Sequence, residues 1–251
     1  MSSTNDQVLQ KIQFYVTAPY ACGYLSNQMA KSLIATPQDL VDGYQYSGLI
    51  QQGFRRSGKF VYRPHCESCQ ACISVRLPVS KFQASRSQKR AFKQHQSLEI
   101  SISRLNFDEA QFALYQAYQA ARHQDAKDDT VNEEEKDSAA QYRDFLVQSN
   151  VDSLCISFFS GDQLKMVSVV DIVEDGVSAV YTFYDTSDNK ASFGTYSVLW
   201  LIEWCKQLHL PYLYLGYWIQ NSSKMAYKRN FMPQEALVQG QWQLIERFIE
   251  Q

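Results

Sequence analysis

The chain has 251 residues, of which 45% are hydrophobic and 14% aromatic, and its formal net charge is -2. This composition excludes an intrinsically disordered chain and suffices for one large or two modest domains. No apolar run approaches the roughly 20 residues that span a bilayer, and the polar N-terminus lacks a signal-peptide core, so we expect a cytoplasmic protein without a membrane segment. In that reducing compartment, six cysteines are typical of metal ligands or buried thiols.

The charge is unevenly distributed along the chain. Residues 1–104 carry 13 Lys/Arg and 5 Asp/Glu, whereas residues 105–251 carry 11 and 21. A basic half of this kind is typical of proteins that bind nucleic-acid phosphates, although two ordinary domains with unequal surface charge have the same signature. We therefore predict a basic, cysteine-rich N-terminal domain over 1–104 and a second domain over 105–251.

The first half of the chain predicts alternating short helices and strands. Apolar residues at Leu25, Met29, Leu33 and Ile34 have helical spacing and predict a helix over 25–34. The further elements expected here are a helix over 38–52 that ends at Gly53, strands over 60–63 and 73–77, a helix over 82–95 and a strand over 98–105.

The second half changes character at about residue 150, where β-branched, apolar runs begin. A helix is expected from Asp108 to His123 and another over 138–148, before this change. The elements that follow are strands over 153–159, 164–174 and 177–184, a helix over 194–208, a strand over 212–216 and a short helix capped by Ser222. Such an order is typical of a GNAT-like acyltransferase, so we predict an α+β fold with a GNAT-like C-terminal domain and a smaller α+β N-terminal domain.

Cys66, Cys69 and Cys72 lie at three-residue spacing between two predicted strands, and Cys22 lies upstream. Thiols with this spacing converge on a metal ion or cluster, and His65 is a possible substitute ligand. The residues leave zinc, an iron–sulfur cluster and metal-free thiols open.

Motifs along nearly the whole chain match one family, in order. They include Cys22–Leu25, Gly53–Gly58, Tyr62–Cys66, Cys69–Cys72, Phe82–Gln88, Val180–Asp185, Gly194–Ser197, Tyr214–Tyr217 and Lys224–Lys228. On these stretches the chain resembles the bacterial, leucine-transferring members of the arginyl-tRNA–protein transferase family. The resemblance implies transfer of leucine from leucyl-tRNA to the N-terminal Asp or Glu of acceptor proteins, which marks them for degradation. It implies leucyl-tRNA and such proteins as partners, and the transfer itself requires no cofactor.

Within this reading, the cations divide into two groups. An acidic N-terminal residue needs a cation that recognises a carboxylate, and Arg76, with Arg55 and Arg56 next, is the predicted acceptor-binding set. The tRNA backbone needs several dispersed cations. The residues predicted for that role are Arg86, Lys89, Arg90, Lys93, Lys224 and Lys228.

Tyr181 and Asp185 end a predicted central strand, where a GNAT-like cleft opens, and are the predicted catalytic residues. Asp185 is the best acidic candidate for holding the incoming α-amine. An aminoacyl ester is already activated, so the attack of a neutral amine needs positioning, proton removal and oxyanion stabilisation, without a covalent enzyme intermediate.

Two other functions fit parts of the sequence. One is a GNAT-like acetyltransferase that uses acetyl-CoA, which the turn at Gly194 disfavours because it contains a single glycine. The other is a non-catalytic RNA-binding protein built on a metal knuckle, which the strand-rich second half disfavours. Activity that survives RNase treatment would favour the acetyltransferase.

Overall fold

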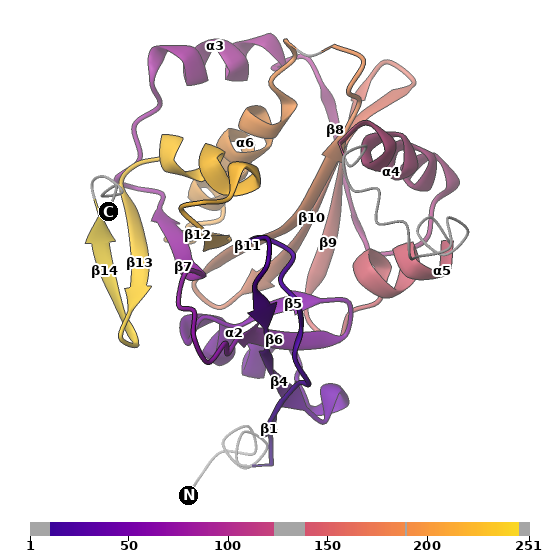
Figure 1. Ribbon diagram of the computed structural model, residues 1–251. Coiled ribbons are helices and arrows are strands. Elements are labelled where there is room, and N and C mark those ends of the chain that lie inside the picture. Colours follow the sequence, from indigo (N-terminus) through magenta and orange to yellow (C-terminus); the bar gives the residue numbers. More distant parts are fainter. Residues whose placement is uncertain (1–10, 123–138, 189, 246–251) are drawn as a thin grey trace, which may run out of the picture.

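Most of the chain is organised around one eight-stranded sheet. The computed structural model describes residues 11–122, 139–188 and 190–245, and these have a mixed α+β architecture (Figure 1). The strand order is β14-β13-β7-β12-β11-β10-β9-β8. Its strands are β7 (Ile73–Pro78), β8 (Glu99–Arg104), β9 (Ser153–Ser160), β10 (Gln163–Val173), β11 (Gly176–Tyr184), β12 (Tyr212–Trp218), β13 (Gln234–Val238) and β14 (Gln241–Ile245).

Two smaller sheets belong to the N-terminal part of the chain. A four-stranded sheet has the order β1-β4-β6-β5, and β2 pairs with β3. The bounds are β1 (Gln13–Val16), β2 (Tyr20–Ala21), β3 (Met29–Ala30), β4 (Ser32–Thr36), β5 (Arg55–Ser57) and β6 (Phe60–Pro64). The predicted helix over 25–34 is therefore wrong. Its apolar residues Leu33 and Ile34 lie in β4, which pairs with β1 and β6, and a short apolar run does not by itself distinguish a helix from a strand.

The other predicted helices are confirmed, with shifted bounds. The 38–52 segment divides into a 3₁₀ turn and a helix that begins after Asp42, whose carboxylate accepts hydrogen bonds from the backbone of Tyr44 and Gln45. Ser222 precedes the last helix without a capping side-chain bond. The bounds are η1 (Gln38–Leu40), α2 (Gly43–Gln51), α3 (Arg86–Gln94), α4 (Glu109–Arg122), α5 (Ala139–Tyr142), a π-helical turn η2 (Arg143–Val147), α6 (Phe193–Gln207) and the 3₁₀ helix η3 (Ser223–Asn230).

Helices cover both faces of the large sheet. Met166 and Val170 of β10 belong to the core beneath α6, whereas Val167 and Val169 belong to the core beneath α4. Neighbouring side chains of a strand point to opposite faces, so α6 and α4 lie on opposite sides. Figure 1 shows α3 next to α6 and well away from α4. No helix in the described ranges is long and apolar enough to cross a bilayer.

Strands from both halves of the chain share the large sheet. β7 pairs with β12 and β13, and β8 pairs with β9. Backbone hydrogen bonding therefore crosses the predicted boundary at residue 104, and the division into two domains stays a prediction.

Candidate active site

The two central strands β11 and β12 separate soon after they begin. They are parallel and share three residue pairs, the last of which is Ser178 with Tyr214. A bulge at Val180 interrupts the pairing of β11 with β10, and another interrupts β12 before Gly216. Bulges re-aim strands and release backbone groups from the ladder. The two strands share no residue pair beyond Ser178 and Tyr214, and this unpaired stretch at the centre of the sheet is called the gap between β11 and β12.

Arg55 fills this gap. It belongs to β5 of the small sheet, and its guanidinium donates to the Ser178 hydroxyl at 3.0 Å and to the Ala179 carbonyl of β11. On the other side it contacts Gly216 of β12, because a Cβ atom there would lie 3.3 Å from its Cζ, Nε and Nη2 atoms. With 9% of its surface exposed, Arg55 is a buried cation that links the small sheet to the gap.

Lys228 is a second buried cation nearby. It lies in η3, is 4% exposed, and its ammonium group donates to the Tyr217 carbonyl of β12. Burial, followed by the charge of Arg55, lowers the pKa of Lys228 to about 7. Lys228 was predicted to contact tRNA phosphates. That role stays a prediction, and the structure directs the ammonium group to the Tyr217 carbonyl rather than to the surface.

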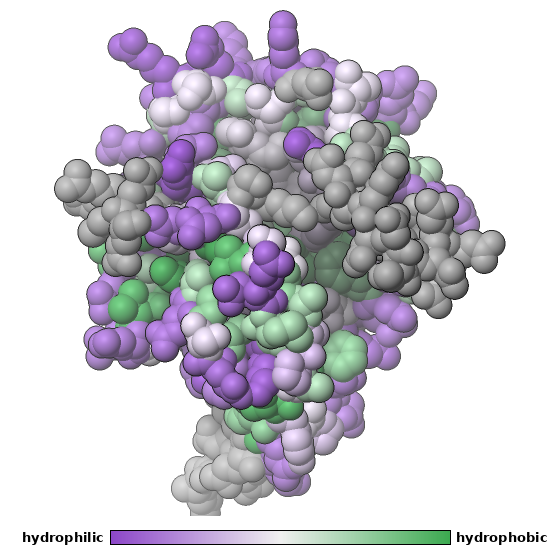
Figure 2. Space-filling view, in the orientation of Figure 1, coloured by the Kyte–Doolittle hydropathy of each residue, from purple (hydrophilic) through white to green (hydrophobic). Residues whose placement is uncertain are grey.

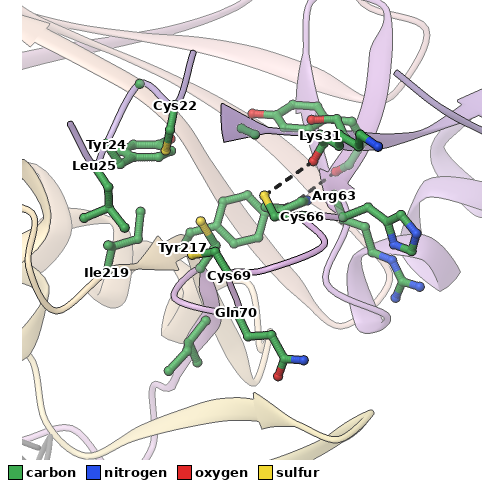
Figure 3. A pocket seen from close by; sticks show the side chains of 18 of the residues that line it. Cys22, Tyr24, Leu25, Lys31, Arg63, Cys66, Cys69, Gln70, Tyr217 and Ile219 are labelled. Carbon is green, nitrogen blue, oxygen red and sulfur yellow. Dashed lines mark hydrogen bonds between the residues drawn. The ribbon is translucent and has the colours of Figure 1, made fainter. Parts of the chain in front are cut away.

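A pocket of about 810 Å³ is lined by neighbours of these two cations rather than by the cations themselves. Tyr62, which pairs with Arg55 across the small sheet, and Tyr217, whose carbonyl accepts from Lys228, both line it. The pocket is lined by residues of β2, β3, β6 and the cysteine loop, by Tyr217 of β12, and by Ile219 just after that strand. Figure 3 shows the Tyr217 ring within the pocket, with Tyr24 and Leu25 on one side and Arg63 on the other. The pocket thus joins the small sheets to the centre of the large one.

All four predicted metal-binding cysteines line this pocket: Cys22, Cys66, Cys69 and Cys72. Burial, together with the other three thiols, raises the pKa of Cys72 to about 12. The Cys66 thiol points to the Lys31 carbonyl at 3.8 Å (Figure 3).

Even so, no three His, Cys, Asp or Glu side chains in the described part of the chain are placed to hold a metal ion. The predicted zinc or iron–sulfur site is therefore unsupported, because the thiols share a pocket without converging on one point. His65 also lines the pocket and completes no such group.

Arg76, the preferred acceptor-binding residue, is already neutralised. Its Nε donates to Glu235 at 2.8 Å, and its Nη1 lies 3.5 Å from Asp175 and 3.0 Å from the Tyr214 hydroxyl. Its guanidinium also stacks on Tyr212, with 3.6 Å between Cζ and the ring centre. These contacts hold β7, β12 and β13 together and pair the charge of Arg76 with two carboxylates of the protein.

The guanidinium of Arg56 is also paired with a carboxylate of the protein. It forms a buried ion pair with Asp171 of β10, with 2.8 Å between Nη2 and the carboxylate. Its Nη1 donates to the carbonyls of Gly58 and Gln148. The pair joins β5 to the large sheet, and the acceptor contact of Arg56 stays a prediction.

The basic stripe on α3 is exposed, as its sequence predicts. Ser85 and Gln88 form a capping box at the start of this helix, and Gln88 and Ala91 are buried against the protein. In Figure 2, hydrophilic side chains project from the edge where Figure 1 places α3. The four predicted tRNA-binding residues of the helix are exposed: Arg86, Lys89, Arg90 and Lys93. Lys224 lies in η3, and its side chain is outside the described residues.

The two predicted catalytic residues, Asp185 and Tyr181, lie in different surroundings. The Asp185 carboxylate accepts from the backbone of Ser187 and forms a 2.9 Å ion pair with Lys165. These bonds lower its pKa to about 2. Tyr181 packs in the core beneath α4, where its hydroxyl lies 3.4 Å from Gln119 and burial raises its pKa. Within the described ranges, neither residue forms a hydrogen bond or an ion pair with Arg55 or Lys228.

The comparisons with known proteins agree with one another. Family models described as "Arginine-tRNA-protein transferase", N terminus and C terminus, match residues 20–90 and 110–238. An aspartate/glutamate leucyltransferase of Methylobacillus flagellatus is 60% identical over 100% of this chain and 99% of its own. Proteins of that name from Nitrosospira multiformis and Thiobacillus denitrificans are 48% and 49% identical, covering 98% and 94% of this chain and 96% of each relative.

Among solved structures, the L-PGS structure from Bacillus licheniformis has a TM-score of 0.43 and 10% identity, covering 66% of this chain and 47% of that one. The two family models and the full-length relatives rest on sequence matches along the whole chain. This chain belongs to the arginine-tRNA-protein transferase family.

Proposed function

We propose that this protein transfers leucine from leucyl-tRNA to the N-terminal amine of proteins that begin with Asp or Glu. The observation that carries the proposal is the 60% identity, over the full length of both chains, to a protein named aspartate/glutamate leucyltransferase. Products would carry an N-terminal leucine, the signal for degradation that the sequence resemblance implies. Since aminoacyl-tRNA is a cytoplasmic molecule, the proposal keeps the predicted cytoplasmic location.

We further propose a GNAT-like acyl-transfer centre at the gap between β11 and β12. Three features support it: a strand pair that separates after Ser178 and Tyr214, a bulge at Val180, and the helix α6 that follows β11. In such a centre the ester of leucyl-tRNA lies in the gap, and the acceptor amine attacks its carbonyl carbon. The amine loses a proton, and the ribose oxygen leaves with one.

The two substrates would approach from different sides of the molecule. The exposed cations of α3 suit the dispersed phosphates of tRNA, and α3 packs on α6 next to the sheet. The 810 Å³ pocket beside Tyr217 suits the start of an acceptor chain. Asp185 is ionised at neutral pH because its pKa is about 2, so its proposed role is to hold an ammonium group rather than to accept a proton.

The test supplies purified protein with radiolabelled leucyl-tRNA and a peptide that begins with Asp. We expect labelled peptide, and much less product from an otherwise identical peptide that begins with Asn or Lys. Arginyl-tRNA and phenylalanyl-tRNA serve as donor controls. Equal transfer from all three donors, or product formation after RNase treatment of the donor, would reject leucyl-tRNA as the specific substrate.

A further inference from the structure

Arg55 and Lys228 are buried without a carboxylate partner. Among the described residues, neither side chain forms an ion pair, and the acceptors of their charged groups are the Ser178 hydroxyl and the carbonyls of Ala179 and Tyr217. Burial of a charge is costly unless an opposite charge compensates it. Two such cations near one another, within a family that acts on acidic substrates, indicate that the compensating anion comes from outside the chain.

The tyrosines around the pair supply no negative charge. Arg55 lies within electrostatic range of Tyr46, Tyr62 and Tyr217, and burial raises the pKa of all three above its ordinary value of 10.0. They are therefore neutral hydroxyls at neutral pH. Arg55 also interacts electrostatically with Tyr24 and Tyr227. Burial raises the pKa of each of these tyrosines to about 12. The tyrosines around the pair are thus polar and uncharged, and the carboxylate that also acts on Tyr46, Asp171, is paired with Arg56.

The other two predicted carboxylate-binding arginines differ in this respect. Asp171 neutralises Arg56, and Glu235 and Asp175 neutralise Arg76. Arg55 alone of the three has only neutral acceptors in the described part of the chain. An external carboxylate would therefore be bound more strongly at Arg55 than at either neighbour, since it would not compete with a carboxylate of the protein.

We propose that Arg55 and Lys228 together bind the side-chain carboxylate of the acceptor's N-terminal residue. This inference rests on the proposed function and names the residues that select its acidic substrate. A guanidinium and an ammonium group match the two oxygens of a carboxylate, whereas an amide would leave both charges uncompensated. Tyr62 and Tyr217, which line the pocket and adjoin Arg55, mark the side from which the residue enters.

The charge state of Lys228 provides a specific readout. Its pKa of about 7 means that most of the free protein carries a neutral amine at about pH 8. A bound carboxylate favours the ammonium form, so binding of an acidic residue must take up a proton. A purely structural lysine would produce no such uptake.

The experiment is isothermal calorimetry with the full chain, without tRNA, in two buffers of different ionisation enthalpy at about pH 8. The probes are two peptides that differ only in an N-terminal Asp or Asn. We expect the wild-type protein to bind the Asp peptide at least about 30-fold more tightly, as expected for loss of a buried charge-assisted pair. We also expect uptake of close to one proton more with the Asp peptide than with the Asn peptide.

Two single substitutions separate the contribution of Arg55 from that of Lys228. Arg55→Gln should remove most of the preference for Asp, and Lys228→Met, which is similar in size, should reduce the preference and abolish the extra proton uptake. Lys31→Met is the matched control, since Lys31 lines the same pocket but is already paired with Glu67. Its preference and proton uptake should stay at wild-type values.

Two results would overturn the inference: equal wild-type binding of both peptides, or loss of the preference in Lys31→Met with retention in both other variants. The second would place carboxylate recognition at the pocket mouth. Because binding is measured without leucyl-tRNA, an inactive transfer assay would count against the proposed function alone. The calorimetry would then still show whether Arg55 makes the protein prefer the Asp peptide over the Asn peptide.

Discussion

The guanidinium of Arg55 lies directly against the backbone of Gly216, at the point where β12 leaves β11. A Cβ atom at position 216 would lie 3.3 Å from three atoms of Arg55, and Gly216 has a φ of +78°. The glycine thus meets two demands, because its backbone conformation is unfavourable for other residues and its missing side chain leaves room for the cation.

Gly216→Ala should therefore cost both stability and acceptor recognition. A left-handed non-glycine residue costs about 1–2 kcal/mol, which a shift of the urea midpoint would report. Gly240→Ala is the matched control, since Gly240 has the same φ of +78° and its Cβ would meet nothing within 4 Å. Both should lose similar stability, and only Gly216→Ala should weaken binding of an Asp peptide. Equal binding by both variants would show that Arg55 tolerates displacement.

Arg56→Met should unfold the protein more easily instead of changing substrate choice. Removal of one partner leaves Asp171 as an uncompensated buried charge, which costs about 3–5 kcal/mol. The double variant Arg56→Met with Asp171→Leu should recover part of that loss, because it leaves no unpaired charge. Urea denaturation measures all three proteins. Wild-type stability in Arg56→Met, with a raised KM for the peptide, would restore Arg56 to the acceptor site.

Lys228 should make stability rise with pH from about neutral upward. Its folded pKa of about 7 lies below its ordinary 10.5, so between these values the unfolded chain holds a proton that the folded chain has released. Stability then increases with pH, by at most about 1.4 kcal/mol per pH unit. Cys72 acts in the opposite direction above its ordinary pKa of 9.0, so the window to examine is about pH 6.5–8.5. In Lys228→Met, this rise should disappear.

The α3 cations should control tRNA affinity and its salt dependence. Lys89→Ala with Arg90→Ala removes two exposed charges and should lower the salt slope of leucyl-tRNA binding by about two counterions. The control is Lys11→Ala with Arg104→Ala, which removes the same charge from exposed positions on other elements. Filter binding across a range of salt concentrations gives the slopes. Identical slopes in both double variants would argue for a diffuse field rather than a phosphate track on α3.

Asp185→Asn should weaken the binding of all acceptor peptides by a similar factor. If the carboxylate holds the α-ammonium group, its loss raises KM for Asp-starting and Asn-starting peptides by a similar factor. This pattern differs from that of Arg55→Gln, which should affect only the acidic peptide. Steady-state transfer with both peptides distinguishes the two. An unchanged KM for both would limit Asp185 to its ion pair with Lys165.

Elements with a long, regular pattern were predictable from the sequence, and short strands in the N-terminal part were not. The meander β9–β11 and the helices α4 and α6 follow their apolar periodicity closely. β5 has three residues, two of them arginines, and nothing in Arg55–Ser57 signals a strand. It pairs with β6 in a hairpin that turns at Gly58 and Lys59, and it is anchored to the large sheet by Arg56 and Asp171, a partner 115 residues away that leaves no local signal.

The same limit applies to the site. The sequence identified Arg55 as one basic residue among several, but could not show that Arg56 and Arg76 have internal carboxylates and Arg55 does not. Lys228 is more instructive, because a lysine in a basic helical stretch is usually exposed. Its burial depends on β12 and on Gln234 and Phe231 around η3, which meet only in the folded chain. A nearby Met-Ala-Tyr sequence was the only hint of an apolar setting.

The central place of β7 limits how this protein can be divided or recombined. Residues 73–78 lie between β12 and β13, so a fragment that starts at residue 105 would expose the hydrogen-bonding edges of both strands. Such a fragment should aggregate or remain unfolded rather than act as a free-standing transferase. Chimeras between relatives that exchange their front halves would have to carry β7 together with its Arg76 partners on β13. The front half and the back half of the chain are thereby inherited as one unit, and a change in β7 must be accommodated by β12 and β13.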